Sequence, residues 1–287
     1  MGKRSPIFAY LAVAVALVWT LLPVYWLLRM ALLIPAEIAS FPPPFLPHHP
    51  QPGNLLNVIG FDYRTSDGLL LKASGQARQV VNGLLNSAVV ATATTILTMF
   101  IVVPLAYVFG RMEFRFKTPL FMAVLFAVAV PPVSTLIPFY SLFTKLGLTG
   151  TRTGLVLVTL TVTVPFVTWM LIGYFRNIPP VEKLAAVDGL TRMETLLGVV
   201  VPLARNGITV AAIMSFLFSW NEYVFATTLV NGTDATTLPA AASGFLFQQP
   251  EPGQMAAAIC LSMIPAALVV LFLQRHITEM NLVDPVR

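Results

Sequence analysis

Six long apolar runs, separated by shorter polar stretches, make up most of the chain. They lie at about 7–28, 84–109, 119–140, 154–175, 206–230 and 254–273. A helix needs roughly 20 apolar residues to cross a bilayer core about 30 Å thick, and each run reaches that length. The pattern therefore predicts an all-α polytopic membrane protein, with six transmembrane helices packed as one domain over residues 1–287.

Composition agrees with a membrane protein. Of the 287 residues, 57% are hydrophobic and only 10% are charged, and the mean hydropathy is +0.81. These values lie outside the range of ordinary soluble domains. The single cysteine, Cys260, lies inside the sixth run, so the sequence offers neither a disulfide framework nor a cysteine metal site.

Lysine and arginine are shared unevenly between the two predicted sides. With the N-terminus inside, the inner segments hold the larger set, and the outer segments hold Arg64, Lys72, Arg78, Lys145 and Arg152. The inner set is Lys3, Arg4, Arg111, Arg115, Lys117, Arg176, Lys183, Arg192, Arg205, Arg275 and Arg287. This positive-inside bias predicts that both termini are cytoplasmic. The net charge of +5 then reflects the inner loops rather than nucleic-acid binding.

Basic residues lie at both ends of the first run. The run follows MGKRSP and is longer than the 7–15 apolar residues of a signal peptide, so we interpret it as a retained anchor. Arg29, at its outer end, is expected to extend toward the interface and counts for neither side.

Two of the predicted outer segments have distinctive compositions. Residues 35–83 form the larger one, and its start, SFPPPFLPHHPQPGN, is too rich in proline for regular helix or sheet. His48 and His49 in this stretch are expected to be solvated loop residues rather than a metal pair. The loop 231–253 exposes FLF. Its Phe245, Leu246 and Phe247 are candidates for contact with a partner protein, or for resting at the membrane interface.

The sequence lacks the common catalytic patterns. No G-x-x-x-x-G-K-[ST], H-E-x-x-H or G-x-S-x-G occurs, so the chain is not expected to hydrolyse ATP or to be an enzyme. Glu222, in SWNEYVF, is the main charge inside a run, and such a residue usually faces a bundle interior or water. Glu222 and Asn221 are therefore candidates for a translocation pathway. A structural role, with Asn221 bonding across helices, is an equal alternative.

Prolines and hydroxyl groups interrupt the apolar runs. A proline beyond the first turn of a helix removes a hydrogen bond and kinks or breaks the helix. Most serines and threonines here are expected to bond back to their own helix, as in TATTILT and TLTVTV. Bent helices with hydroxyl-bearing faces suit a pathway for a polar solute. The prolines are Pro23, Pro104, Pro131, Pro132, Pro138, Pro165 and Pro265.

The inner loop 176–205 contains PPVEKLAAVDGLTRMETLLGVVVPL. After the two prolines, VEKLAAVD predicts a short helix with Val181, Leu184 and Ala185 on one face. Gly189 is placed where a left-handed glycine ends a helix. Thr191 and Glu194 match a capping box that opens a second helix.

This loop is interpreted as a docking element. Ala185 and Ala186 are small enough to permit close approach by another surface. The alternative is an amphipathic helix lying on lipid, but one lysine and a short apolar face make that a weak anchor.

The loop resembles the EAA loop of permease subunits of ATP-binding-cassette importers. In that family the pattern is E-A-A, three residues, Gly, nine residues, then I-x-L-P. Asp188 and Gly189 match its D-G core, Ala185 its second alanine and Pro202 its last proline. Lys183 stands at the glutamate position with Glu182 one place earlier, and Leu184 replaces the first alanine.

Other stretches extend the resemblance over most of the chain. NSAVVATATT, PLAYVFGRMEFRFK, PPVSTLIPFYSLFTKLGL, WNEYVFATTL and IPAALVVLFLQR look like the second permease of carbohydrate importers for maltose or alginate fragments. The proline-rich outer segment and the C-terminal EMNLVDPVR depart from it. The resemblance implies the type I importer permease fold. It also implies that residues 182–185, 188, 189 and 202 couple to the ATPase.

The resemblance further implies a heteromeric importer in the bacterial inner membrane. This chain would pair with a second permease, two ATPase subunits that bind ATP and Mg²⁺, and an outer solute-binding protein. It would itself carry no cofactor, and would convert ATPase closure into alternating access for a sugar or oligosaccharide. A self-contained ion-coupled transporter is the main alternative and an intramembrane enzyme a third. Neither explains the glycine-turned loop.

Overall fold

The structure, a computed structural model, describes residues 6–65, 68, 70–248 and 250–278. Its contacts divide the chain into two compact units. Unit 1 comprises Met1–Gly83 and Leu238–Ile264, and unit 2 comprises Leu84–Thr237 and Pro265–Arg287. The termini predicted to be cytoplasmic, at 1–5 and 279–287, lie outside the described residues. The single domain expected from the sequence stays a prediction.

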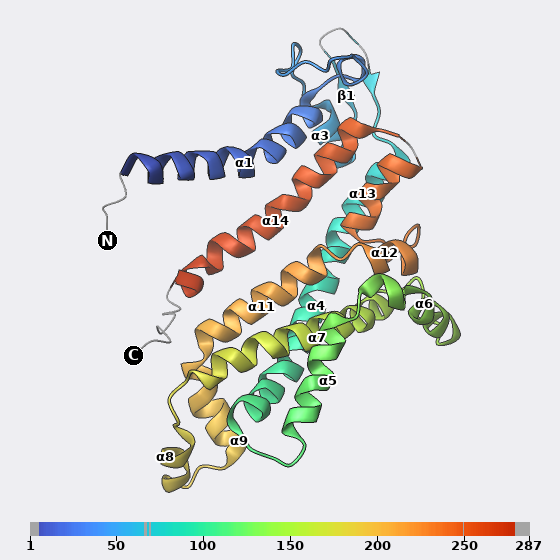
Figure 1. The fold of residues 1–287 in the computed structure, drawn as a ribbon. Helices are drawn as coiled ribbons and strands as arrows, with labels where there is room; N and C mark the ends of the chain where they lie inside the picture. The colour runs from blue at the N-terminus through green and yellow to red at the C-terminus, as the bar shows by residue number, and fades with distance from the viewer. Residues whose placement is uncertain (1–5, 66–67, 69, 249, 279–287) are drawn as a thin grey trace. The chain divides into compact units, whose positions relative to one another are not determined.

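Unit 1 combines membrane helices with the outer segment (Figure 1). Helix α1 (Pro6–Leu32) is followed by α2 (Pro35–Ile38) and α3 (Gly53–Val58). Strands β1 (Tyr63–Arg64) and β2 (Leu70–Leu71) form an antiparallel pair in which Tyr63 faces Leu71. The start of α4 (Gly75–Arg111), helix α13 (Leu238–Phe247) and the first part of α14 (Pro252–Thr278) complete it. Residues 40–52 of the proline-rich stretch form no helix or strand, as predicted, but its last two residues, Gly53 and Asn54, begin α3.

The position of the Arg29 side chain differs from the one predicted. Its side chain is buried rather than extended toward the interface. The guanidinium lies 4.4 Å from the Trp26 ring centre and donates from Nε to the carbonyl of Pro44 at 2.6 Å. The reason is that the proline-rich segment returns over the end of α1 and offers a carbonyl that a bare helix end lacks. Arg29 thus fixes that segment to the helix.

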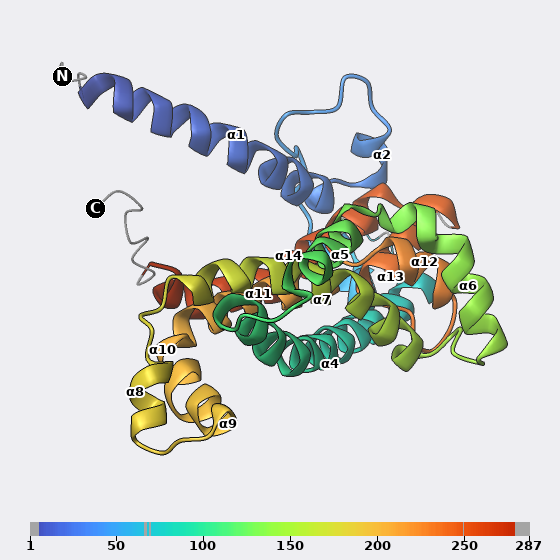
Figure 2. The same cartoon turned by 60° about the horizontal axis from the view of Figure 1, so that its bottom comes forward.

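Unit 2 is built around α7 (Arg152–Arg176), which packs against α5 (Lys117–Ala129) and α11 (Arg205–Trp220) (Figure 2). It also holds most of α4 (Gly75–Arg111), α6 (Leu136–Lys145), α12 (Val224–Leu229) and the later part of α14. Between α7 and α11 come α8 (Glu182–Val187), α9 (Arg192–Thr195), the π-helical turn η2 (Leu196–Val200) and α10 (Val201–Leu203).

Among the described residues, four helices are long and apolar enough to cross a membrane on their own, namely α1, α4, α7 and α14. The third predicted span is instead broken. Helices α5 and α6 meet at 92° through the 3-10 turn η1 (Pro132–Thr135), because Pro131 and Pro132 interrupt the helical bonding. The fifth predicted span is also divided, since α11 ends at Trp220 and α12 begins at Val224. The second bent pair is a different one, in which Arg192–Leu203 meets α11 at 82°. With each of the two bent pairs counted as one span, the described residues hold up to six.

Candidate functional site

The inner loop turns at Gly189. Its φ of +80° is in the left-handed region, which the absence of a side chain makes accessible. The Leu190 N–H donates to the carbonyl of Ala185 at 3.0 Å, and the Gly189 N–H donates to that of Ala186 at 3.2 Å. These two bonds form a Schellman motif that ends α8. The helix end predicted at this glycine is confirmed.

The second half of the loop starts with the predicted capping box. The Glu194 N–H donates to Oγ1 of Thr191 at 3.3 Å, and the Thr191 N–H donates to Oε2 of Glu194 at 2.7 Å. Hydrogen bonds from Thr191 keep the pKa of the Glu194 carboxyl below its ordinary value. The capping box prediction is confirmed, and it sets the direction in which the chain enters α9.

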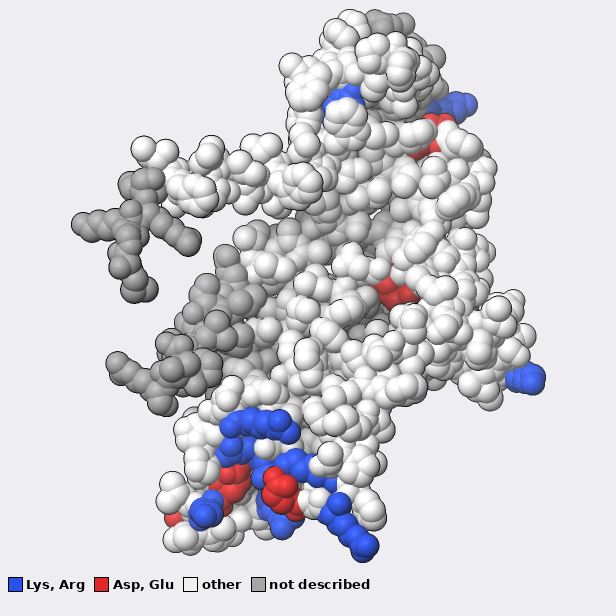
Figure 3. All heavy atoms as spheres, in the orientation of Figure 1, with Lys and Arg blue, Asp and Glu red and all other residues white. Residues whose placement is uncertain are grey.

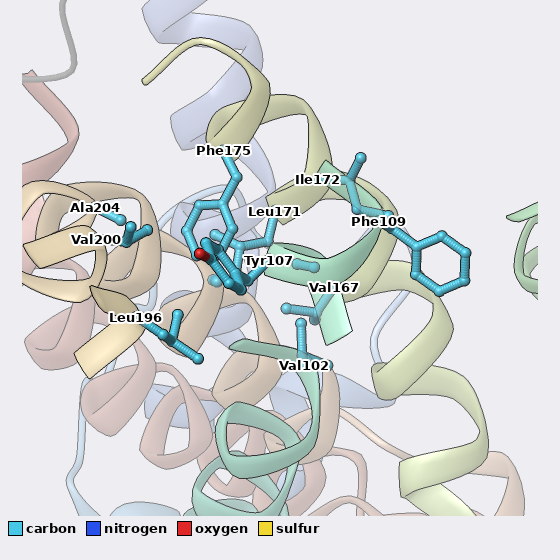
Figure 4. Packing of buried hydrophobic residues seen from close by; sticks show 12 residues of the cluster. Val102, Tyr107, Phe109, Val167, Leu171, Ile172, Phe175, Leu196, Val200 and Ala204 are labelled. Atoms are coloured by element: carbon cyan, nitrogen blue, oxygen red, sulfur yellow. The ribbon is translucent and has the colours of Figure 1, made fainter. Parts of the chain in front are cut away.

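From α9 onward the loop becomes part of the bundle core. Leu196, Val200 and Ala204 are buried in one cluster with residues of α4 and α7, among them Tyr107 and Phe175 (Figure 4). The chain then bends by 82° into α11, after Pro202 in α10. The end of the loop is therefore packed directly against α4 and α7.

Arg111, the last residue of α4, holds the first half of the loop. Its Nε donates to Oε1 of Glu182 at 2.6 Å and its second terminal nitrogen donates to Oε2 at 2.8 Å, which is a bidentate pair. The same guanidinium donates to the carbonyls of Phe175, Ile178 and Pro179. One arginine thus joins α4, the end of α7 and the start of α8.

Two faces of α8 have different neighbours. Val181 and Ala185 face inward, and Ala185 is buried by its own chain. Leu184 is 69% exposed and Val187 is 86% exposed. The sequence placed Leu184 with Val181 and Ala185 on one apolar face, but the bundle covers only Val181 and Ala185, because the short helix meets the bundle with one edge. For the same reason Ala186, not Ala185, is open to another surface.

Charged side chains surround this exposed apolar face. Lys183 and Asp188 are exposed beside Leu184 and Val187. Figure 3 shows lysine, arginine, aspartate and glutamate side chains gathered at the end of unit 2 that carries α8 and α9. An exposed apolar patch with a polar rim is typical of a protein interaction site. One side of α8 is therefore held against the bundle, and its other side is exposed and available to a partner protein.

The Arg111–Glu182 pair predicts a pH dependence. Hydrogen bonding from Arg111 lowers the pKa of the Glu182 carboxyl from its ordinary 4.5. A lowered folded-state pKa stabilises the fold above pH 4.5, and this stabilisation is lost as the pH falls through the folded value. We expect Glu182→Gln to remove that part of the acid sensitivity, measured by thermal unfolding of the purified chain between pH 7 and 3.5. An unchanged acid profile in Glu182→Gln would contradict the assignment.

Asn221 and Glu222 occupy the break between α11 and α12. The Glu222 carboxylate accepts the backbone N–H groups of Phe225 and Ala226, each at 2.8 Å. Asn221 donates to the Leu217 carbonyl of its own helix at 2.9 Å, not to another helix. The cross-helix bond considered from the sequence is therefore absent at Asn221. Both contacts favour a structural role at the break, in which Glu222 caps α12.

The FLF stretch lies in a helix rather than in a loop. Residues 238–247 form α13, and small residues let α13 pack on the first turn of α4, where Gln76 donates to the Ala241 carbonyl at 2.8 Å. Phe245 is 0% exposed and belongs to the core of unit 1, so its predicted exposure is wrong. Leu246 and Phe247 are exposed, as predicted.

His48 and His49 are not part of a metal cluster. Both backbone N–H groups donate to Oε1 of Glu37, at 3.0 and 3.3 Å. Within the described residues, no group of three or more His, Cys, Asp or Glu side chains is arranged to hold a metal ion.

Comparisons with known proteins agree with this geometry. The family described as binding-protein-dependent transport system inner membrane component matches residues 102–279. The trehalose transport system permease protein of Mycobacterium tuberculosis is 34% identical over 201 residues, which cover 68% of this chain and 73% of that protein. The sulfoquinovosyl glycerol transport system permease protein of Agrobacterium fabrum is 28% identical over 273 residues, covering 94% and 90%.

A solved structure shows the same fold. A chain from a bacterial ABC transporter involved in the import of the acidic polysaccharide alginate superposes with a TM-score of 0.74 at 18% identity. The match covers 96% of this chain and 98% of that one. The matched family segment includes the whole inner loop, all of α7 and the end of α4 that carries Arg111. The chain therefore belongs to the family of binding-protein-dependent transport system inner membrane components.

Proposed function

We propose that this chain is the permease subunit of a sugar importer, and that it converts ATP hydrolysis by partner subunits into alternating access. The observation that carries the proposal is the inner loop, which exposes α8 and is joined to α4 and α7 by Arg111 and by buried side chains. Relatives named as permeases for trehalose and for sulfoquinovosyl glycerol support a sugar as the solute. Family membership disfavours a self-contained ion-coupled transporter.

The proposed complex contains ATPase subunits, a second permease and a solute-binding protein in addition to this chain. The sequence has no P-loop, so ATP and Mg²⁺ belong to two ATPase subunits that dock on α8 from the cytoplasm. A second permease would complete the transmembrane part, and a solute-binding protein would deliver sugar from outside. With both termini in the cytoplasm of a bacterial inner membrane, α8 lies on the ATPase side.

Individual loop residues take different parts in this proposal. Leu184, Val187, Lys183 and Asp188 are exposed and form the surface that meets the ATPase. Glu182 and Ala185 face their own chain, so we assign them to positioning α8. Gly189 and Pro202 set the directions in which the chain enters and leaves the docking region.

Reconstitution of the full complex in proteoliposomes tests the function. The assay follows ATP-dependent uptake of trehalose, maltose, sulfoquinovosyl glycerol and an alginate oligosaccharide, each with the cognate binding protein. We expect uptake of at least one sugar that requires both ATP and binding protein. Uptake by this chain alone on an ion gradient would contradict the proposal, as would a complex that imports no sugar.

A narrower experiment tests contact with the solute-binding protein. We expect Leu246→Ala with Phe247→Ala to raise roughly fivefold the binding-protein concentration that half-stimulates ATP hydrolysis. Fivefold in affinity corresponds to about 1 kcal/mol, a cost that only the minority of interface side chains with the largest contributions exceed when they are truncated. Phe272→Ala is the matched control, because Phe272 and Phe247 are both 74% exposed. If the double variant and Phe272→Ala need the same binding-protein concentration for half-stimulation, this contact is ruled out.

A further inference from the structure

The break between α5 and α6 borders a cavity within unit 2. Its volume is about 380 Å³, within the range of about 300–1,000 Å³ typical of small-molecule sites. The end of α5, the turn η1, and helices α6, α7 and α11 form its wall. Its lining includes Ala127, Val128, Thr135, Thr161, Phe166 and Phe218.

The broken helix leaves carbonyl groups without their usual partners. In a continuous helix, the carbonyls of Ala127 and Val128 would accept from the residues four positions later. Those residues are Pro131 and Pro132, which have no backbone N–H. Freed carbonyls at membrane depth are tolerated only where protein or a watery cavity satisfies them. Ala127 and Val128 both line this cavity.

Two hydroxyl groups add further acceptors. Thr161 Oγ1 donates to the Val158 carbonyl at 2.6 Å, and Thr135 Oγ1 donates to the Pro132 carbonyl at 2.8 Å. Each hydroxyl proton is therefore committed to its own helix, while the oxygen lone pairs remain able to accept. None of the described residues that line the cavity carries a charge. The polar part of the wall is thus neutral and accepting.

Phenylalanine rings form another part of the wall. Phe166 and Phe218 meet edge to face, with ring centres 4.8 Å apart and planes at 62°. The face of an aromatic ring carries partial negative charge and attracts the weakly positive edges of C–H groups. A neutral sugar ring complements both parts of the wall. Its hydroxyls can donate to the acceptor groups, and the C–H groups on its faces can contact the aromatic rings.

We propose that this cavity is a binding site for a neutral sugar on the translocation pathway, so that this subunit itself contacts the solute. The inference rests on the proposed function and assigns it a site. It places the pathway at the α5–α6 break rather than at Asn221 and Glu222, neither of which lines this cavity. In secondary transporters, discontinuous helices also form substrate and ion sites, where unwound backbone carbonyls act as ligands.

Uptake by hydroxyl and ring variants is the first test. In the reconstituted complex, Thr161→Val removes an acceptor at nearly constant volume and Phe166→Leu removes a ring. We expect each to lower sugar uptake about fivefold or more. ATP hydrolysis stimulated by the binding protein, which occurs in other chains, should stay within about twofold. Thr95→Val and Phe100→Leu are matched controls, because Thr95 also bonds back to its helix and Phe100 is strongly exposed on α4.

Cysteine labelling is the second test, and it reads the cavity directly. Replacing Cys260, the only cysteine, by alanine gives a background for Thr161→Cys and for Phe100→Cys as control. A water-soluble cationic methanethiosulfonate reagent is expected to modify Thr161→Cys at least tenfold faster than Phe100→Cys. Saturation with the sugar that the wild-type complex imports should slow that reaction at least threefold.

The outcomes separate this inference from the function on which it rests. A wild-type complex that imports a sugar, with cavity variants that behave as their controls, overturns the site and leaves the function standing. Labelling of Thr161→Cys only by a membrane-soluble maleimide marks a lipid-filled cavity and also overturns it. A complex that imports only acidic sugars overturns the assignment to a neutral solute. A complex that imports no sugar overturns both the site and the function.

Discussion

Arg111→Ala is expected to reduce ATP-dependent sugar uptake by at least about tenfold while the chain still inserts and assembles. The variant loses the bidentate bond to Glu182 and three bonds to carbonyls at the end of α7. Breaking a buried ion pair costs about 3–5 kcal/mol. The side chains are 9% and 30% exposed, so solvent screening places this pair below that range. Uptake and stimulated ATP hydrolysis in proteoliposomes measure the effect together.

Two further variants separate geometry from charge. Arg111→Lys keeps the charge but loses the planar fork, so we expect an intermediate loss of uptake. Arg115→Ala is the matched control, because the neighbouring Arg115 is exposed and rests on the Phe116 ring at 5.4 Å. Wild-type uptake by Arg111→Ala, in a complex that assembles normally, would show that the link between α4 and α8 is not needed for coupling.

The features that the sequence predicted well are those decided by neighbouring residues. The Gly189 turn and the Thr191–Glu194 capping box each depend on contacts within a few positions, so residue type and spacing identify them. Membrane spans are local in the same sense, because a run of apolar residues is enough to favour the bilayer. These features define where the docking loop begins and turns.

The features that the sequence did not predict depend on distant segments. Arg111 and Glu182 are 71 positions apart, and neither carries a local signal of the pair. Phe245 is buried because α13 packs on the first turn of α4, and the exposure of Leu184 depends on which edge of α8 meets the bundle. Periodicity identifies a face but does not say which face another element covers.

The break of the third span is an intermediate case. Pro131 and Pro132 indicated a kink, but hydrophobicity continues through them, so residues 119–140 were predicted as one span. The two helices meet at 92° because consecutive prolines remove two donors from the same turn. By contrast, Pro104 and Pro165 remain inside α4 and α7, where a single missing donor is accommodated. The number of consecutive prolines is therefore the more informative signal.

Gly189→Val is expected to leave the chain inserted and assembled but to uncouple ATP hydrolysis from uptake. At φ of +80°, a β-branched residue is strained by roughly 1–3 kcal/mol. No atom lies within 4 Å of the position that a Cβ would take, so the strain comes from the backbone alone. Relief of that strain requires a different φ, which breaks the Schellman bonds and reorients α8. The bundle core does not include this turn, so assembly is preserved.

Two control variants make the Gly189 prediction specific. Gly198→Val is matched, because Gly198 lies in the same loop with open space around it and without a positive φ, and we expect its uptake to stay near wild type. Gly189→Asn should recover much of the uptake, since asparagine tolerates the left-handed conformation. The decisive quantity is sugar imported per ATP hydrolysed in the reconstituted complex. If Gly189→Val matches the wild-type ratio, the turn does not set the angle at which α8 meets the ATPase. If Gly198→Val lowers the amount of sugar imported per ATP as much as Gly189→Val does, the effect arises from the added side chain rather than from the left-handed backbone.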